Sequence, residues 1–191
     1  MTFAYQNKSF FFVFLVLHIS VYILVSHAYD PKCPPKSVNE VCNRSGKELY
    51  MYCIALFNTG SVENGDMRFL AYYTRDFAEN NATNALEWIN STLVPSLPDS
   101  YIQEVLNVCK DAFTRLKDEL VNRVNPMIVE NVRFQEAKAW VNYGIGFMDS
   151  CKAVCNAKPQ VVCPLKDNIR DTQGVLKLLA VVLELLTEGV M

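Results

Sequence analysis

Residues 101–124 form the most strongly patterned stretch of the sequence, and they constrain the fold more than any other segment. Their apolar side chains stand at Ile102, Val105, Leu106, Cys109, Phe113, Leu116, Leu120 and Val124. Steps of three and four place one continuous apolar stripe on an α-helix. Residues 98–100 (Pro-Asp-Ser) supply a break and a capping residue before this helix, and Pro126 is expected to end it.

The first 28 residues have the pattern of a secretory signal peptide. Residues 10–25 form an almost wholly apolar run of 16, and small side chains follow in Ser26-His27-Ala28. The run is short for a membrane span. We therefore expect cleavage after Ala28, a mature chain of 163 residues (191 minus 28) and secretion without a membrane anchor. Three N-x-S/T sequons also support export, and they begin at Asn43, Asn81 and Asn90.

Cleavage would remove both histidines, His18 and His27, so the mature chain has no imidazole. Ser–His and Cys–His dyads and His-ligated metal sites are then excluded. We predict no cofactor and no enzymatic activity. The mature net charge is about −3 (17 basic minus 20 acidic residues once Lys8 leaves), and no basic block alternates with aromatic residues. This composition argues against nucleic acid as a partner.

Seven cysteines remain after cleavage: Cys33, Cys42, Cys53, Cys109, Cys151, Cys155 and Cys163. In a secreted chain this count indicates a disulfide framework with one cysteine left over. A metal site at Cys151, Cys155 and Cys163 is the alternative. Secretion oxidises thiols, however, and no fourth ligand stands at a recognisable spacing.

A small helical hairpin is predicted ahead of the long helices. Residues 29–36 are rich in proline and should be extended. The sequence from Ser37 to Glu40 has the form of a capping box, which predicts a short helix from residue 37 to about Cys42. A turn at 43–46 and a second helix over 47–57 complete the hairpin, and Cys42 and Cys53 are placed to close it.

Three further segments repeat the helical pattern, and they span residues 66 to about 94, 130–155 and 165–186. Residues 79–84 interrupt the first of these stripes, so we expect a kink there or an exposed turn with a glycan on Asn81. Four long amphipathic helices with short connections predict an up-down-up-down bundle over 66–189. The whole helical domain would then cover 37–189.

The chain resembles the plant invertase and pectin methylesterase inhibitor family over essentially all of its mature length. The most telling segments are V-C-N-R-S-G-K-E-L-Y-M-Y-C (41–53) and C-K-D-A-F-T-R-L-K-D-E-L (109–120). The second is similar to the family's C-x-x-x-Y-x-x-A-x-x-x-L, with Phe113 and Leu116 where Tyr and Ala are usual. The resemblance implies an all-α protein in which a helical hairpin precedes a four-helix bundle.

The resemblance also implies the disulfides Cys42–Cys53 and Cys109–Cys151. Cys33, Cys155 and Cys163 are additional to the family pattern. A Cys155–Cys163 pair would leave Cys33 free or joined to a second chain, and Cys33–Cys155 and Cys33–Cys163 stay open as well. We expect a monomer, or a disulfide-linked dimer through the odd cysteine.

In function, the resemblance implies an inhibitor of a carbohydrate-active enzyme, secreted to the apoplast and cell wall or delivered to the vacuole. Relatives cover the substrate cleft of pectin methylesterase with a bundle face, or insert a Pro-Lys-Phe turn into invertase (β-fructofuranosidase). Val132-Arg133-Phe134 matches that turn in part, which makes Arg133 and Phe134 candidate partner-binding residues. The alternative is an ordinary helix start. We favour pectin methylesterase, the target of the larger branch.

Two other classes remain open. A helical bundle with an unfilled interior could bind lipid or another small apolar ligand. A glycosidase could use carboxylates, and the candidates are Asp111, Asp118, Glu119, Glu130 and Glu136. Their spacing is that of solvated helix surfaces, which favours a binding protein over an enzyme.

Overall fold

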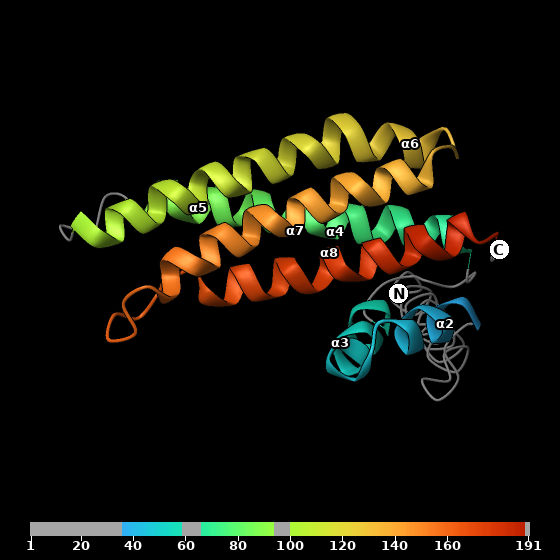
Figure 1. Cartoon of the computed structure of the whole chain (residues 1–191), viewed down its shortest axis with the longest axis horizontal. Helices are drawn as coiled ribbons and strands as arrows, with labels where there is room; N and C mark the ends of the chain where they lie inside the picture. Colours follow the sequence, from blue (N-terminus) through green and yellow to red (C-terminus); the bar gives the residue numbers. More distant parts are fainter. Residues whose placement is uncertain (1–35, 59–65, 94–99, 190–191) are drawn as a thin grey trace, which may run out of the picture. The chain divides into compact units, whose positions relative to one another are not determined.

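The computed structural model describes residues 36–58, 66–93 and 100–189, and every regular element among them is helical (Figure 1). The predicted all-α fold is therefore confirmed. The signal peptide, the extended segment up to residue 35 with Cys33, and the linkers 59–65 and 94–99 lie outside the described residues.

The predicted hairpin consists of α2 (Lys36–Arg44) and α3 (Lys47–Asn58). Gly46 makes the turn between them with a φ of 82°, a left-handed conformation that suits glycine. The predicted capping box is wrong. The helix already begins at Lys36, and the buried Oγ of Ser37 has no hydrogen-bond partner among the described residues.

The first long helix, α4 (Met67–Trp88), starts as predicted at Asp66, whose carboxylate accepts a 2.8 Å hydrogen bond from the Arg68 backbone N–H. The exposed turn expected at 79–84 is wrong, because the α-helix runs through this stretch without a break. Its buried stripe is carried there by small side chains, namely Ala78, Ala82 and Ala85. A π-helical turn, Ile89–Leu93, follows.

The predicted helix of residues 101–124 is α5 (Ser100–Glu119) followed by a π-helical turn, Leu120–Val124. Pro126 does not end it, contrary to prediction, since the chain continues as α6 (Asn125–Val129). The Asn125 backbone N–H reaches five residues back to the Leu120 carbonyl. Pro126 then lies in the first turn of α6, where a missing N–H costs no helical hydrogen bond.

The remaining long helices are α7 (Phe134–Asn156) and α8 (Lys166–Thr187). α7 begins four residues later than predicted because a Schellman turn ends α6. In that turn the Val132 N–H donates to the Met127 carbonyl at 3.1 Å, and the Asn131 N–H donates to the Ile128 carbonyl at 3.1 Å. Asn131 has a left-handed φ of 56°.

The four long helices contact one another in the cyclic order α4, α5, α7, α8, which confirms the predicted four-helix bundle (Figure 1). α8 contacts α2 and α3 as well as α4 and α7. It is therefore buried around most of its circumference rather than along one stripe. The buried set is Ile169, Thr172, Gln173, Gly174, Val175, Leu176, Leu178, Leu179, Ala180, Val182, Leu183 and Leu185.

None of the helices in the described ranges is both long enough and apolar enough to cross a membrane.

Candidate functional site

Three aromatic side chains follow one face of α7 beside α5. Trp140, Tyr143 and Phe147 are spaced by three and four residues, so they share one side of the helix. Trp140 and Phe147 are half-buried, whereas Tyr143 is 62% exposed. The Trp140 and Tyr143 ring centroids are 5.6 Å apart. The aromatic surface is thus held in place at its ends and open to solvent at its centre.

Two arginines cover the ends of this aromatic row, Arg115 of α5 and Arg123 of the π-helical turn that follows α5. The guanidinium carbon of Arg123 lies 5.3 Å from the Trp140 ring centroid, and that of Arg115 lies 5.8 Å from the Phe147 ring centroid. These are cation–π distances. Asp111 also holds Arg115, through a 3.1 Å ion pair. We call these five residues, Arg115, Arg123, Trp140, Tyr143 and Phe147, the aromatic–arginine face.

The aromatic–arginine face has the composition that dominates protein–protein recognition. Tyrosine, tryptophan and arginine supply most binding energy at interfaces. Here the arginines are already positioned by rings of the neighbouring helix, so little side-chain freedom would be lost on binding. The sequence analysis did not identify this site. The spacing of residues 140, 143 and 147 places their side chains on one side of a helix. That spacing indicates a binding face only when the position of α5 beside α7 is known.

The turn that resembles an invertase-binding segment is placed at the start of α7. Arg133 is exposed, has a left-handed φ of 54°, and its guanidinium lies 3.6 Å from the Glu136 carboxylate. Phe134 is half-buried and packs against the core. The two side chains therefore face different surroundings, as in the alternative reading of an ordinary helix start.

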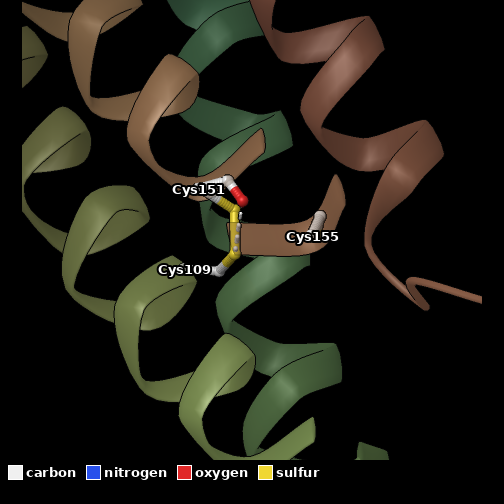
Figure 2. Close-up of side chains that lie close together, drawn as sticks. All are labelled: Cys109, Cys151 and Cys155. Atoms are coloured by element: carbon white, nitrogen blue, oxygen red, sulfur yellow. Dashed lines mark hydrogen bonds between the residues drawn. A yellow bond between two sulfur atoms is a disulfide. The ribbon is translucent and has the colours of Figure 1, made fainter. Parts of the chain in front are cut away.

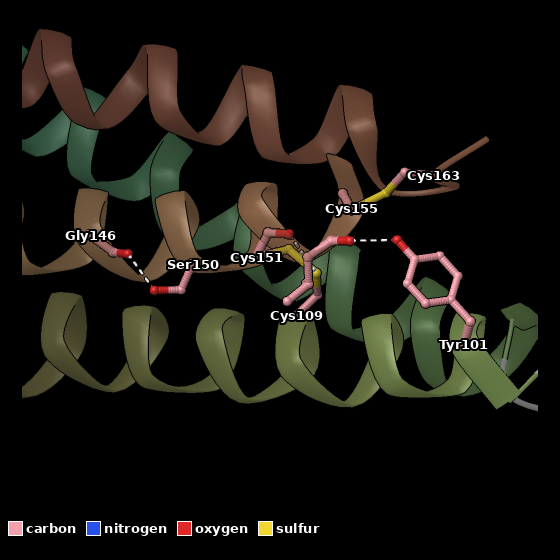
Figure 3. Close-up of a disulfide and its surroundings, with 8 residues drawn as sticks. Tyr101, Cys109, Gly146, Ser150, Cys151, Cys155 and Cys163 are labelled. Carbon is pink, nitrogen blue, oxygen red and sulfur yellow. Dashed lines mark hydrogen bonds between the residues drawn. A yellow bond between two sulfur atoms is a disulfide. The ribbon is translucent and has the colours of Figure 1, made fainter. Parts of the chain in front are cut away.

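Three disulfides join the described cysteines. Cys42 is bonded to Cys53 and Cys109 to Cys151, with Cα atoms 5.4 and 4.7 Å apart, and these are the pairs that the resemblance implies. Cys155 is bonded to Cys163. Figure 3 shows this last bond at the end of α7, where the Tyr101 hydroxyl donates a 2.7 Å hydrogen bond to the Val154 carbonyl.

The closest group of side chains that could ligate a metal consists of cysteines, not carboxylates. Within the described ranges, one set of three or more His, Cys, Asp or Glu side chains has all its ligand atoms within 4.8 Å of one another. It consists of Cys109, Cys151 and Cys155, all of which are in disulfides. A thiolate metal site at these sulfurs would require those bonds to be reduced.

The five carboxylates that were candidates for glycosidase chemistry lie on the surfaces of the helices. Asp111 pairs with Arg115, and Glu136 lies near Arg133. Asp118 and Glu130 are exposed. Glu119 is half-buried, and its Oε2 has no hydrogen-bond partner in the described structure. The geometry does not gather them around a common point.

A cavity of about 260 Å³ opens where α7 ends and α8 begins. Its lining residues are Lys152, Cys155, Asn156, Lys166, Ile169, Arg170 and Gln173. Three of the seven carry positive charge, and the cavity lies at one end of the two helices. An apolar-ligand module would instead need an enclosed interior space between the bundle helices.

The three sequon asparagines lie on helices. Asn43 is exposed in the last turn of α2, and Asn90 is exposed in the π-helical turn after α4. Asn81 is half-buried within α4. Of the three, Asn43 and Asn90 have the accessibility that a glycan requires, and their glycosylation stays a prediction.

Comparison with known proteins gives a similarity in three-dimensional structure rather than in sequence. No family model and no curated protein matches the sequence. A crystal structure of a mutant form of a pectin methylesterase inhibitor from Arabidopsis aligns with a TM-score of 0.68 over 77% of this chain and 95% of that chain, at 15% sequence identity. The chain therefore has the fold of that inhibitor structure.

Proposed function

We propose that the protein is a secreted inhibitor of a cell-wall carbohydrate-active enzyme, and that its target is a pectin methylesterase. The proposal rests on the fold that the chain shares with a pectin methylesterase inhibitor. The sequence resemblance points to the same activity. Secretion would follow from the signal peptide and agrees with the three disulfides.

The aromatic–arginine face is the part of the surface best suited to bind the enzyme. Tyr143 offers a large exposed ring at the centre, and Arg115 and Arg123 flank it from the neighbouring helix. Arginine forks pair with carboxylates, and aromatic rings fill clefts at low entropic cost. Such a face would inhibit by occupying a substrate cleft and excluding water from it, with no chemistry of its own.

Invertase is the second candidate target, and Arg133 is the observation that favours it. This arginine is exposed at a left-handed backbone position, so it projects from a sharply defined turn. Val132, just before it, is also exposed. The half-buried ring of Phe134 weakens this candidate, because a ring packed on the core cannot also enter an active site.

The test is a paired inhibition assay with the purified, oxidised protein. It is titrated against a plant pectin methylesterase and a plant cell-wall invertase at mildly acidic pH. We expect loss of pectin methylesterase activity at a one-to-one ratio, with invertase unaffected. Inhibition of invertase alone would identify invertase as the target and the turn at Arg133 as the binding segment. Inhibition of neither enzyme by a protein that remains folded would overturn the proposal.

A further inference from the structure

The crosslink between α5 and α7 and the crosslink of the following loop meet at Cys155. The Sγ atoms of Cys109, Cys151 and Cys155 all lie within 4.8 Å of one another. Figure 2 shows Cys155 one turn beyond Cys151 on α7, close to the Cys109–Cys151 bond. The sulfur of one disulfide is therefore close to the sulfurs of another, which is the arrangement that thiol–disulfide exchange requires.

The four sulfurs differ in their access to solvent. Cys109 and Cys151 are fully buried, and Cys155 is 6% exposed. Cys163, in the loop between α7 and α8, is only partly buried. A thiol in solution would therefore reach Cys163 first, and the buried Cys109–Cys151 bond would be shielded from direct attack.

We propose that Cys155 is a thiol–disulfide exchange site through which a soluble dithiol moves the α5–α7 crosslink by one helical turn. One thiolate of the dithiol attacks the Cys163 sulfur, and Cys155 leaves as a thiolate. The second thiol of the dithiol then displaces Cys163, which leaves as a thiol. The dithiol has lost two electrons and has become a disulfide, and the Cys155–Cys163 pair has gained them.

The Cys155 thiolate then attacks the neighbouring bond. It forms Cys109–Cys155 and releases Cys151, which takes up a proton. Attack on the Cys151 sulfur is disfavoured, because side chains four residues apart on a helix have β-carbons about 5–6 Å apart. A disulfide needs roughly 3.5–4.5 Å. Helix geometry therefore selects Cys109 as the new partner.

Charged neighbours favour the departure of Cys155 as a thiolate. Lys152 and Lys166 line the same cavity as Cys155, and neither forms an ion pair with any described residue. Arg170 lines it too, but it is paired with Asp167 and Asp171 at 3.0 Å each. Positive charge near a sulfur stabilises its thiolate form.

The exchange would alter the end of α7 and leave the bundle crosslinked. Moving the bond by four residues shifts it about 6 Å along the helix axis. The loop that follows α7 loses its covalent tie at Cys163. Its start stays attached to α5, where the Lys158 N–H donates to the Tyr101 hydroxyl at 3.2 Å. Exchange would thus loosen the α7–α8 connection specifically.

The test maps disulfides in the oxidised full-length protein during limited treatment with dithiothreitol. Samples are quenched with acid, alkylated with N-ethylmaleimide, digested and analysed by mass spectrometry. We expect a peptide pair joined through Cys109 and Cys155, together with alkylated Cys151 and Cys163. If Cys155 and Cys163 become alkylated while Cys109–Cys151 stays intact at every time point, the proposal is overturned.

Two matched variants supply the control, because each leaves one free thiol of the Cys155–Cys163 pair. Cys163→Ser frees Cys155 and is expected to accumulate Cys109–Cys155. Cys155→Ser frees Cys163, should keep Cys109–Cys151, and should lose that bond to dithiothreitol about tenfold more slowly than the wild type. Equal rates in Cys155→Ser and wild type would refute the relay, even if Cys163→Ser failed to fold. A Cys33→Ser background keeps the seventh cysteine out of the exchange.

Discussion

Gly144 of α7 lies directly against Leu116 of α5. A β-carbon at residue 144 would stand 2.7 Å from Cδ1 of Leu116, closer than side chains pack. Two residues further on, a β-carbon at Gly146 would meet no described atom within 4 Å. The first glycine therefore sets how closely the two helices approach, while the second only weakens the helix that contains it.

Alanine at these two glycines should change stability in opposite directions. Gly146→Ala is expected to raise the free energy of unfolding by about 0.5–1 kcal/mol, because alanine is the better helix former. Gly144→Ala gains the same propensity but overpacks the α5–α7 contact, so a net loss of about 1 kcal/mol is expected. Urea unfolding measures both. Equal stabilisation would mean that Leu116 moves aside freely and that Gly144 does not set the spacing.

The two disulfides that the family resemblance implies should differ in their contribution to stability. Cys109–Cys151 closes a loop of 42 residues and Cys42–Cys53 one of 11. In the chain-entropy model, replacing each pair with alanines lowers the free energy of unfolding by about 4 and about 3 kcal/mol respectively. Guanidinium unfolding of the two double variants checks the order. A larger loss for the hairpin pair would show that local strain or docking outweighs loop entropy.

Tyr52 should make stability depend on pH in the alkaline range. Burial raises its pKa from 10.0 to about 12, with Asp171 adding to the shift. The folded state thus keeps this proton when the unfolded state has lost it, so the stabilisation is full below pH 10 and is lost as pH rises towards 12. The difference in unfolding free energy between wild type and Tyr52→Phe should therefore shrink over that window.

At neutral pH the same substitution should cost about 1 kcal/mol, because the Tyr52 hydroxyl donates to the Asp171 carbonyl at 3.2 Å. Tyr50→Phe is the matched control, because Tyr50 lies on the same helix and is also only partly buried. If both variants showed the same pH profile, the hairpin would not be held to α8 through Tyr52.

Tyr143 should be needed for inhibition but not for folding. Tyr143→Ala removes the exposed centre of the aromatic–arginine face and is expected to weaken enzyme inhibition about 30-fold, the effect of a 2 kcal/mol hot spot. Its thermal midpoint should stay unchanged. Met51→Ala, at a residue 74% exposed on α3, should leave both properties unaltered. Full inhibition by Tyr143→Ala would place the enzyme-binding surface elsewhere.

The sequence was most informative where large apolar residues mark a helix face. Every predicted member of the α5 stripe is buried, because each is large or is a cysteine, whereas the small Ala112 is also buried there and was not predicted. The stripe of α4 was not, since Ala78, Ala82 and Ala85 fill its second half and polar neighbours conceal them. Phe69, a large apolar residue of the same helix, is 41% exposed because the buried face is turned towards the smaller side chains.

Features that depend on neighbouring helices could not be predicted. The π-helical turn before Pro126 lets the chain pass a residue that normally stops a helix, and no local signal marks it. The aromatic–arginine face likewise requires the register of α5 against α7. The periodicity of apolar residues within one helix does not predict how that helix aligns with its neighbour.

The burial of α8 on nearly all sides has a consequence for how the protein is made. Every other described helix leaves the ribosome before α8 does, yet α2, α3, α4 and α7 all pack on it. These segments can form helices early, and α5 can contact α4 and α7, but the bundle cannot close until synthesis reaches residue 187. Folding is therefore expected to be post-translational, with the nascent chain remaining open and able to thread through a translocation channel.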